Sequence, residues 1–130
     1  MKNEGISILV VEDHKLTRDG MALLMSEHYR CTVAASAEEA VRMLSVLAFN
    51  LVITDIKMPG ASGIDLCTYL HQVYPDTVVI AVSGLASIHD QAAAMRQGAL
   101  YYNTEMFAAA GLDADHPARW IDHGHAVMGG

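Results

Sequence analysis

Continuous apolar segments alternate along the chain with segments whose apolar residues recur at helical spacing. The strongest apolar segments are Ile6–Val11, Leu51–Thr54 and Val78–Val82, and all three contain β-branched residues. Continuous rather than alternating apolarity is typical of strands buried on both faces of a parallel sheet. Weaker strands are predicted at Cys31–Ala35 and Ala99–Asn103.

Helices are predicted between these strands, at Lys15–Ser26, Ala37–Leu47, Gly63–Val73 and about Ser87–Gln97. Each carries apolar residues at the spacing of a buried helical face. The apolar positions that define these helices are Leu16, Leu23 and Leu24, then Ala40, Val41, Leu44 and Leu47, then Ile64, Leu66, Tyr69, Leu70 and Val73. Strands and helices therefore alternate along the chain.

Local signals mark where the helices begin and end. The segment from Ser36 to Glu39 has the pattern of a capping box at the start of the second helix. Pro75 ends the third helix and Gly98 ends the fourth. The predicted fold class is α/β, a doubly wound five-stranded parallel sheet with helices on both faces, whose ligand site lies at the carboxyl ends of the strands.

Composition narrows the class of protein further. The 130 residues fit one domain, and 52% hydrophobic with 18% charged residues is a globular balance. The formal net charge of −7 argues against direct binding to nucleic acid, which depends on Lys and Arg. Cys31 and Cys67 lack metal-ligand spacing and are expected to be reduced thiols. With no apolar segment long enough to cross a bilayer, we expect a cytoplasmic domain without membrane contact.

Acidic residues follow two of the predicted buried strands. Glu12 and Asp13 come directly after the first strand and Asp55 directly after the third. Three carboxylates at one sheet edge repel each other unless a cation lies among them, and Mg²⁺ suits a few carboxylates in a solvent-open site. Acids at strand ends are also commonly solvated loop residues, an interpretation that the joint placement of these three disfavours.

Several motifs then occur in order. They are Glu12-Asp13, the segment Asp55-Ile56-Lys57-Met58-Pro59 followed by Gly63, Ser83 after an apolar strand, and Gly98-Ala99 before Tyr102. Over residues 6 to about 103 this order resembles the receiver domains of response regulators in two-component signalling, which have a flavodoxin-like fold. The acidic pair followed by Asp-Ile-Lys-Met-Pro at this spacing is the most specific part of the resemblance.

The resemblance implies that Asp55 takes a phosphoryl group from a phosphohistidine on a sensor histidine kinase or phosphotransfer protein. It also implies that Asp13, Asp55 and the Lys57 backbone carbonyl hold Mg²⁺, with Glu12 assisting through water. Ser83 would contact a phosphoryl oxygen, and Tyr102 would change burial in response, although an ordinary packed aromatic at Tyr102 is an equal alternative. Such a domain is a phosphoacceptor that at most catalyses its own phosphotransfer and dephosphorylation.

Other positions of the motif suggest structural roles. Pro59 is expected to fix the turn after Asp55, and Gly63 to supply backbone angles that other residues resist. The side chain of Lys57 is expected to face solvent, and that of His14 to lie at the rim of the site.

One position departs from the family pattern. Receiver domains usually carry a Lys followed by Pro after the fifth strand, and the alignment places Glu105 and Met106 there. A charge-assisted hydrogen bond is worth about 1.5–3 kcal/mol, so an inward Glu105 would weaken a phosphorylation switch. We therefore expect one receiver domain over 1–130, with a core at about 6–104 and a remodelled final segment at 105–130.

Within that final segment a helix is predicted from about Pro117 to Met128, where apolar residues return at helical spacing. His116, His123 and His125 lie near Asp113, Asp115 and Asp122, a composition that suggests a second metal site. Since no two of these His residues stand at i,i+4, solvated tail residues are the simpler interpretation.

The sequence leaves three alternatives to a phosphorylatable receiver. An atypical receiver would act as an interaction module independent of phosphate, with Glu105 holding one conformation. An aspartyl phosphatase or phosphotransferase is disfavoured because Lys57 stands where such enzymes carry a second Asp. A flavin-binding domain is disfavoured because Glu12 and Asp13 replace a phosphate loop. A downstream output protein or domain and a homodimer are expected only by resemblance.

Overall fold

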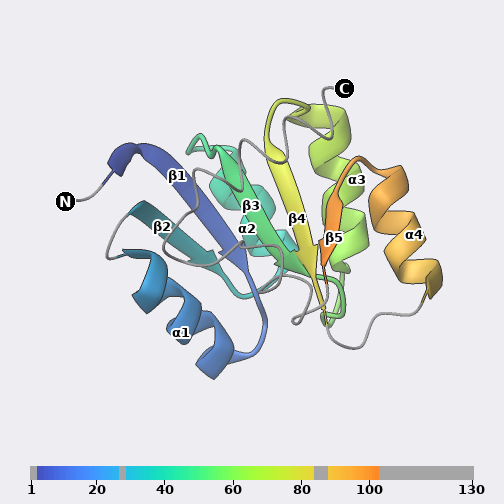
Figure 1. The fold of residues 1–130 in the computed structure, drawn as a ribbon, viewed down its shortest axis with the longest axis horizontal. Coiled ribbons are helices and arrows are strands. Elements are labelled where there is room, and N and C mark those ends of the chain that lie inside the picture. Colours follow the sequence, from blue (N-terminus) through green and yellow to red (C-terminus); the bar gives the residue numbers. More distant parts are fainter. Residues whose placement is uncertain (1–2, 27–28, 84–87, 103–130) are drawn as a thin grey trace.

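The computed structural model describes residues 3–26, 29–83 and 88–102, apart from the side chains at positions 3, 4, 24 and 102. Strands and helices alternate through these residues (Figure 1). They are β1 (Asn3–Val11), α1 (Lys15–Ser26), β2 (Tyr29–Ala34), α2 (Ala37–Leu44), β3 (Leu51–Asp55), α3 (Gly63–Val73), β4 (Val78–Val82), α4 (Ile88–Arg96) and β5 (Leu100–Tyr102).

The strands form one parallel sheet in the order β2-β1-β3-β4-β5. The predicted fold class is thereby confirmed, including the parallel direction of every strand pair. The chain moves outward from β1 to β2 and then crosses back to β3, so the order reverses between β1 and β3. Doubly wound sheets place their ligand sites at the carboxyl ends of the strands at such a reversal.

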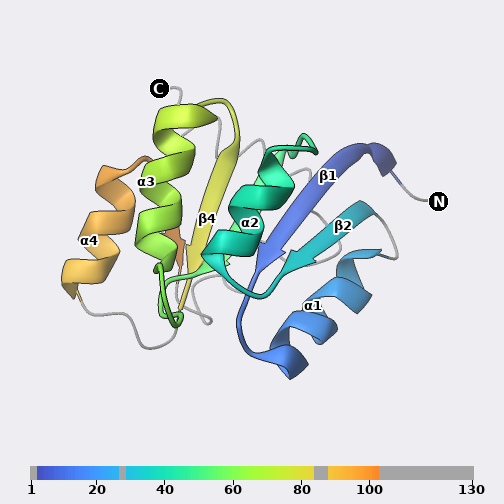
Figure 2. The ribbon, with the colours of Figure 1, turned by 180° about the vertical axis from the view of Figure 1, so that it is seen from behind.

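Helices α2, α3 and α4 cover one face of the sheet, as the view from behind shows (Figure 2). Side chains alternate across a strand, so Leu9 and Val11 of β1 face these helices. They pack in one core with Ala40 of α2, Leu70 of α3 and Ala94 of α4. Burial under these helices explains why every second residue of the central strands is apolar.

The other face of the sheet carries α1. Ile8 and Val10 of β1 point to this side and pack in a second core with Met25 of α1. Ile53 of β3 and Ile80 of β4 belong to the same core. The central strands are therefore buried on both faces, which is why their sequences are uniformly apolar.

Most predicted boundaries are confirmed within two residues, and α1, α3 and β4 match the prediction residue for residue. The second helix ends at Leu44 rather than at the predicted Leu47. The next residues form hydrogen-bonded turns, in which Leu47 N–H donates to the Met43 carbonyl at 2.9 Å. Tyr29 and Arg30 extend β2 beyond the predicted start at Cys31.

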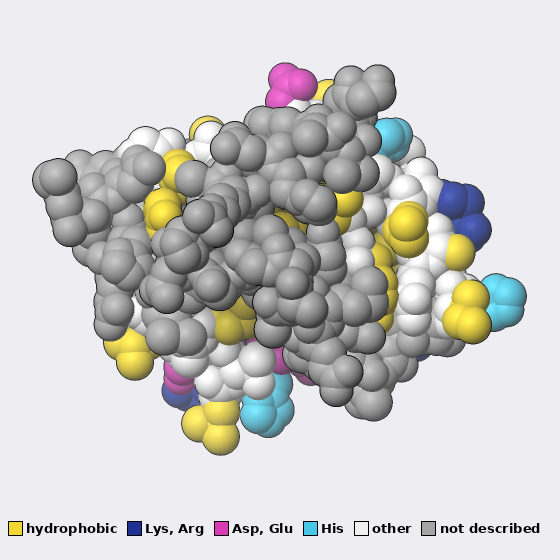
Figure 3. Space-filling view, viewed as in Figure 1, with side chains coloured by type: hydrophobic (Ala, Val, Ile, Leu, Met, Phe, Trp, Pro, Cys, Tyr) yellow, Lys and Arg dark blue, Asp and Glu magenta, His cyan; other side chains and the backbone are white. Residues whose placement is uncertain are grey.

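Two of the predicted inward positions of α1 are wrong, and the third, Leu24, has its side chain outside the described residues. Leu16 and Leu23 are 78% and 70% exposed, whereas Met21 and Met25 pack against the sheet. Two apolar stripes lie about half a turn apart on this helix, and spacing alone does not choose between them. Leu47 and Val73, also expected to be inward or nearly so, are exposed as well. Exposed hydrophobic side chains are visible at separate places on the described surface (Figure 3).

Helix starts are capped by side chains. Ser36 accepts a hydrogen bond from Glu39 N–H at 3.1 Å, as expected, but the Glu39 carboxylate accepts from Ala35 N–H rather than from Ser36. A full capping box occurs instead at α3, where Ser62 and Asp65 bond each other's backbone N–H. Among the described residues, no helix is long and apolar enough to cross a membrane.

Candidate functional site

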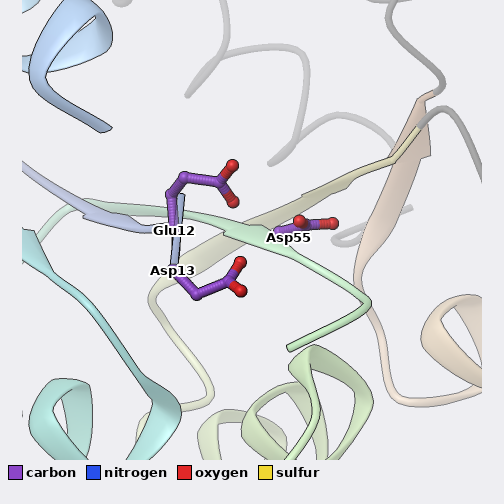
Figure 4. Close-up of side chains that lie close together, drawn as sticks. All are labelled: Glu12, Asp13 and Asp55. Atoms are coloured by element: carbon purple, nitrogen blue, oxygen red, sulfur yellow. The ribbon is translucent and has the colours of Figure 1, made fainter. Parts of the chain in front are cut away.

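Three carboxylates meet where β1 and β3 end. Glu12 and Asp13 follow β1, and Asp55 is the last residue of β3. Val11 is paired with Thr54 in the sheet, so the next residues along each strand, Glu12 and Asp55, stand side by side. Carboxylate oxygens of Glu12, Asp13 and Asp55 lie within 4.8 Å of one another, and the side chains share one space (Figure 4). We call these three residues the acidic cluster.

Burial and neighbouring negative charge both act on Glu12. The residue is only 9% exposed. Burial, a hydrogen bond with Asp55 and the charges of Asp55 and Asp13 raise the pKa of Glu12 from 4.5 to about 7, while Arg18 acts in the opposite direction. A proton on Glu12 relieves the crowding of negative charge, and a bound cation would do the same.

The backbone around the acidic cluster is held by neighbouring side chains. Arg18 of α1 donates from Nη1 to the carbonyls of Glu12 at 3.0 Å and Asp13 at 3.3 Å. The Thr54 hydroxyl donates to the Asp55 carbonyl at 2.9 Å. Arg18 thus fixes the turn that carries two of the three carboxylates.

The segment from Ile56 to Gly63 folds back on the end of β3. Gly63 N–H donates to the Ile56 carbonyl at 3.0 Å, which brings the start of α3 against β3. A Cβ at Gly63 would lie 1.9 Å from the Asp55 carbonyl oxygen. The predicted reason for Gly63 is therefore wrong: its φ is not positive, and glycine is needed there because the two backbones approach so closely.

The unusual backbone angle belongs to Gly60, whose φ is +77°. Beside it, the carboxylate of Glu38 in α2 accepts from Ala61 N–H at 3.0 Å. That bond lowers the pKa of Glu38 below its usual value. The turn after Asp55 is thus tied to α2 as well as to α3.

Lys57 contacts two parts of the molecule. Its backbone N–H donates to Asp55 Oδ1 at 3.4 Å, and its Nζ lies 2.7 Å from Oδ2 of Asp90 in the first turn of α4. The side chain of Lys57 is 59% exposed, so it does face solvent as expected, but its charged end is paired. The pairing with Asp90 was not predicted.

Ser83 lies at the end of β4 and is nearly buried. Its carbonyl accepts a hydrogen bond from the hydroxyl of Tyr101 at 2.8 Å. Tyr101 is therefore a tyrosine whose described side chain contacts Ser83, and the predicted response of Tyr102 stays a prediction. The side chain of Tyr102 lies outside the described residues, as do Glu105, Met106, His116, His123, His125 and the predicted helix at 117–128.

His14 is exposed beside the acidic cluster, with its Nδ1 3.2 Å from the Thr17 hydroxyl, consistent with a rim position. The contributions of Arg18, Glu38 and Asp90 were not found from the sequence. All three lie on helices. Arg18 acts on the turn directly before its own helix, whereas Glu38 and Asp90 act on a loop that only the packing of their helices brings within reach. No motif at fixed spacing connects Glu38 or Asp90 with the turn after Asp55.

Sequence comparison identifies a family. The family model described as response regulator receiver domain matches residues 8–113. The chain is 36% identical over 107 residues to the response regulator protein FleR of Pseudomonas aeruginosa, covering 81% of this chain and 22% of FleR. It is 34% identical over 106 residues to the transcriptional regulatory protein YvrH of Bacillus subtilis, covering 80% of this chain and 44% of YvrH. The chain thus spans less than half the length of these two relatives.

Comparison with solved structures agrees. A receiver domain protein of Methanospirillum hungatei superposes with a TM-score of 0.81 at 26% identity, covering 93% of this chain and 97% of that one. The signal receiver domain of an HD domain-containing protein from Pseudomonas fluorescens gives a TM-score of 0.80 at 26% identity, covering 93% and 98%.

Proposed function

The chain belongs to the family of response regulator receiver domains, and from that premise we propose that its Asp55 accepts a phosphoryl group from a phosphohistidine. Domains of this family are signalling modules of two-component systems rather than enzymes. The observation that carries the proposal is the acidic cluster, in which Asp55 lies beside Glu12 and Asp13 at the point where the strand order reverses.

Mg²⁺ binding at an acidic site is general in this family, and the residues present here fit such an ion. Three carboxylates within 4.8 Å supply hard oxygen ligands, and a cation would neutralise the negative charge of Asp55 and Asp13, which together with burial raises the pKa of Glu12. Asp13, Asp55 and the Lys57 carbonyl would hold the ion directly, and Glu12 through water. The bound ion would neutralise charge on the carboxylates and on the phosphoryl oxygens.

In the proposed transfer, a carboxylate oxygen of Asp55 attacks the phosphorus as the N–P bond of the phosphohistidine breaks. The imidazole leaves with the electron pair of that bond and takes a proton. Phosphoryl transfer depends on positioning and charge stabilisation more than on a general base. Lys57 N–H already donates to Asp55 Oδ1 and orients the nucleophile. Ser83 follows the neighbouring strand β4, and in the proposal its hydroxyl donates to a phosphoryl oxygen.

Switching would follow from the contact with Ser83. In the proposal, Tyr102 of β5 changes its burial when Ser83 engages the phosphoryl group, and the altered surface changes the affinity for partners. Self-catalysed phosphotransfer from a small donor and hydrolysis of the aspartyl phosphate belong to the same chemistry.

The proposed partners are a sensor histidine kinase or phosphotransfer protein and a downstream output protein or domain. We place the domain in the cytoplasm, treat residues 1–130 as one receiver domain, and assign no direct nucleic-acid or membrane contact to it. A homodimer is proposed by family resemblance alone.

The alternative is an atypical receiver that acts as an interaction module without phosphorylation. It is favoured by Glu105, an acid where the family usually has Lys. In that case the acidic cluster would retain its metal, and partner binding would be the same with or without a phosphodonor.

Intact mass after incubation with Mg²⁺ and acetyl phosphate decides between the two. We expect one phosphoryl group on the wild-type chain and none on Asp55→Ala, with Asp76→Asn, which alters an exposed acid in the turn before β4, labelled like the wild type. No labelling under conditions that label another receiver domain would instead support the phosphate-independent module.

A further inference from the structure

Lys57 connects the acceptor carboxylate with α4. Its backbone N–H contacts Asp55 at 3.4 Å and its ammonium contacts Asp90 at 2.7 Å. The residue whose backbone contacts the acceptor carboxylate is therefore paired, through the end of its side chain, with the first turn of α4.

The bond between Lys57 and Asp90 is of a kind that is easily exchanged. The Lys57 side chain is 59% exposed and the Asp90 side chain 23% exposed, so solvent screens the pair from the lysine side. Lysine carries its charge on a flexible four-carbon stem that can reach a second partner. Asp90 stays favourably placed without Lys57, since an acid in the first turn of a helix interacts well with the helix dipole.

A phosphoryl group on Asp55 would be a strong competitor for that ammonium. Such a group carries a charge of about −1.5 to −2, and it would lie next to the backbone of Lys57. Arg18, another described cation beside the acidic cluster, already donates to the Glu12 and Asp13 carbonyls. The position after β5 that usually supplies a Lys carries Glu105.

We propose that Lys57 exchanges partners: it pairs with Asp90 when Asp55 is free and with the phosphoryl group when Asp55 is phosphorylated, so that phosphorylation releases the first turn of α4. This inference rests on the proposed function and specifies its regulation. Lys57 serves both as a cation for the phosphoryl group and as the connection through which α4 responds.

Binding of beryllium fluoride, a phosphoryl mimic, at saturating Mg²⁺ tests the exchange by isothermal titration. Lys57→Gln removes the cation and should raise the Kd about tenfold. Asp90→Asn removes the competitor and should lower the Kd about two- to fivefold. Arg96→Gln in the last turn of α4 and Asp76→Asn remove the same charges at exposed positions elsewhere, and should change the Kd less than about twofold.

The double variant, which combines Lys57→Gln with Asp90→Asn, distinguishes an exchange of partners from a general effect of charge on the binding of beryllium fluoride. If Asp90 acts through Lys57, Asp90→Asn has no effect on the Kd once Lys57→Gln is present. In hydrogen exchange, beryllium fluoride should speed amide exchange in the first turn of α4 in the wild type, and exchange there should already be fast in Asp90→Asn.

Two results overturn the exchange. The first is a shift of the Kd for beryllium fluoride in the same direction in both single variants, as loss of a purely structural pair would cause. The second is an effect of Asp90→Asn on this Kd that persists when Lys57→Gln is also present. Failure of the proposed function looks different: the wild type then neither binds beryllium fluoride nor takes phosphoryl from acetyl phosphate, before any variant is compared.

Discussion

The acidic cluster contains Asp55, and the Lys57–Asp90 ion pair starts from a residue only two positions later, yet different forces create the two arrangements. In the acidic cluster, strand register brings like charges together, and burial together with these charges raises the pKa of Glu12 to about 7. In the ion pair, opposite charges meet through an exposed and flexible lysine. The first arrangement is fixed by the backbone and costs free energy until a cation binds, whereas the second can change partner at little cost.

The difference bears on how a switch is divided between rigid and movable parts. The chemistry at Asp55 needs atoms held in place, which the sheet and the close contact at Gly63 provide. The response needs a contact whose energy is small enough for the phosphoryl group to reverse. The two regions supply these opposite properties a few residues apart.

The largest effect is expected where the backbone of the acidic cluster is most tightly packed. Gly63→Ala would place a Cβ 1.9 Å from the Asp55 carbonyl oxygen, so α3 must move away from β3. We expect the free energy of unfolding in urea to fall by about 3 kcal/mol, with weaker Mg²⁺ binding.

Gly20→Ala is the matched control, because nothing lies within 4 Å of a Cβ at Gly20. Gly20 lies inside α1, so alanine there should stabilise the protein by about 0.5–1 kcal/mol. Equal losses of stability in the two variants would mean that the close approach at Gly63 is not what holds the end of β3.

An intermediate effect is expected from relieving the charge repulsion. Because the pKa of Glu12 is raised from 4.5 to about 7 in the fold, the folded chain holds a proton that the unfolded chain loses. The contribution of Glu12 to stability is thus fully present below pH 4.5 and is lost as the pH rises through 7. In Mg²⁺-free buffer at pH 8, Glu12→Gln should raise the free energy of unfolding by about 1–3 kcal/mol.

The difference between Glu12→Gln and the wild type should shrink at pH 5, where the wild type keeps its proton, and also on adding Mg²⁺ at pH 8. Urea titrations at both pH values measure it. A difference that is independent of pH and of Mg²⁺ would show that Glu12 does not carry the repulsion of the acidic cluster.

The smallest effect is expected at the ion pair. Lys57→Gln should lower the free energy of unfolding by less than about 1 kcal/mol at moderate salt, since the lysine side chain is 59% exposed. Lys15→Gln, which breaks the exposed Lys15–Asp19 pair of α1, should cause a comparably small loss. A loss of several kcal/mol for Lys57→Gln alone would make the pair a rigid support and contradict its exchange between partners.

Many elements of this fold could be predicted because a strand buried on both faces has an apolar residue at nearly every position. Val78–Val82 is apolar at every position, and both of its faces are covered. The acids of the cluster could be predicted for the same reason, since they come where such strands stop. The orientation of α1 could not be predicted in this way. Leu16 and Leu23 stand at helical spacing, but so do Met21 and Met25, and it is the two methionines that pack against the sheet.

The sequence alone determined the α/β class, the parallel sheet and the meeting of Glu12, Asp13 and Asp55, because period and strand ends are local properties that any parallel arrangement preserves. Only the tertiary structure decided that Gly63 needs its lack of a side chain for contact rather than for φ, that Arg18 and Glu38 hold the loops, and that Lys57 meets Asp90. Glu38 and Lys57 meet partners far apart in the chain, whereas the contacts of Arg18 and Gly63 depend on how the following helix starts against the strand end. No local pattern encodes either arrangement.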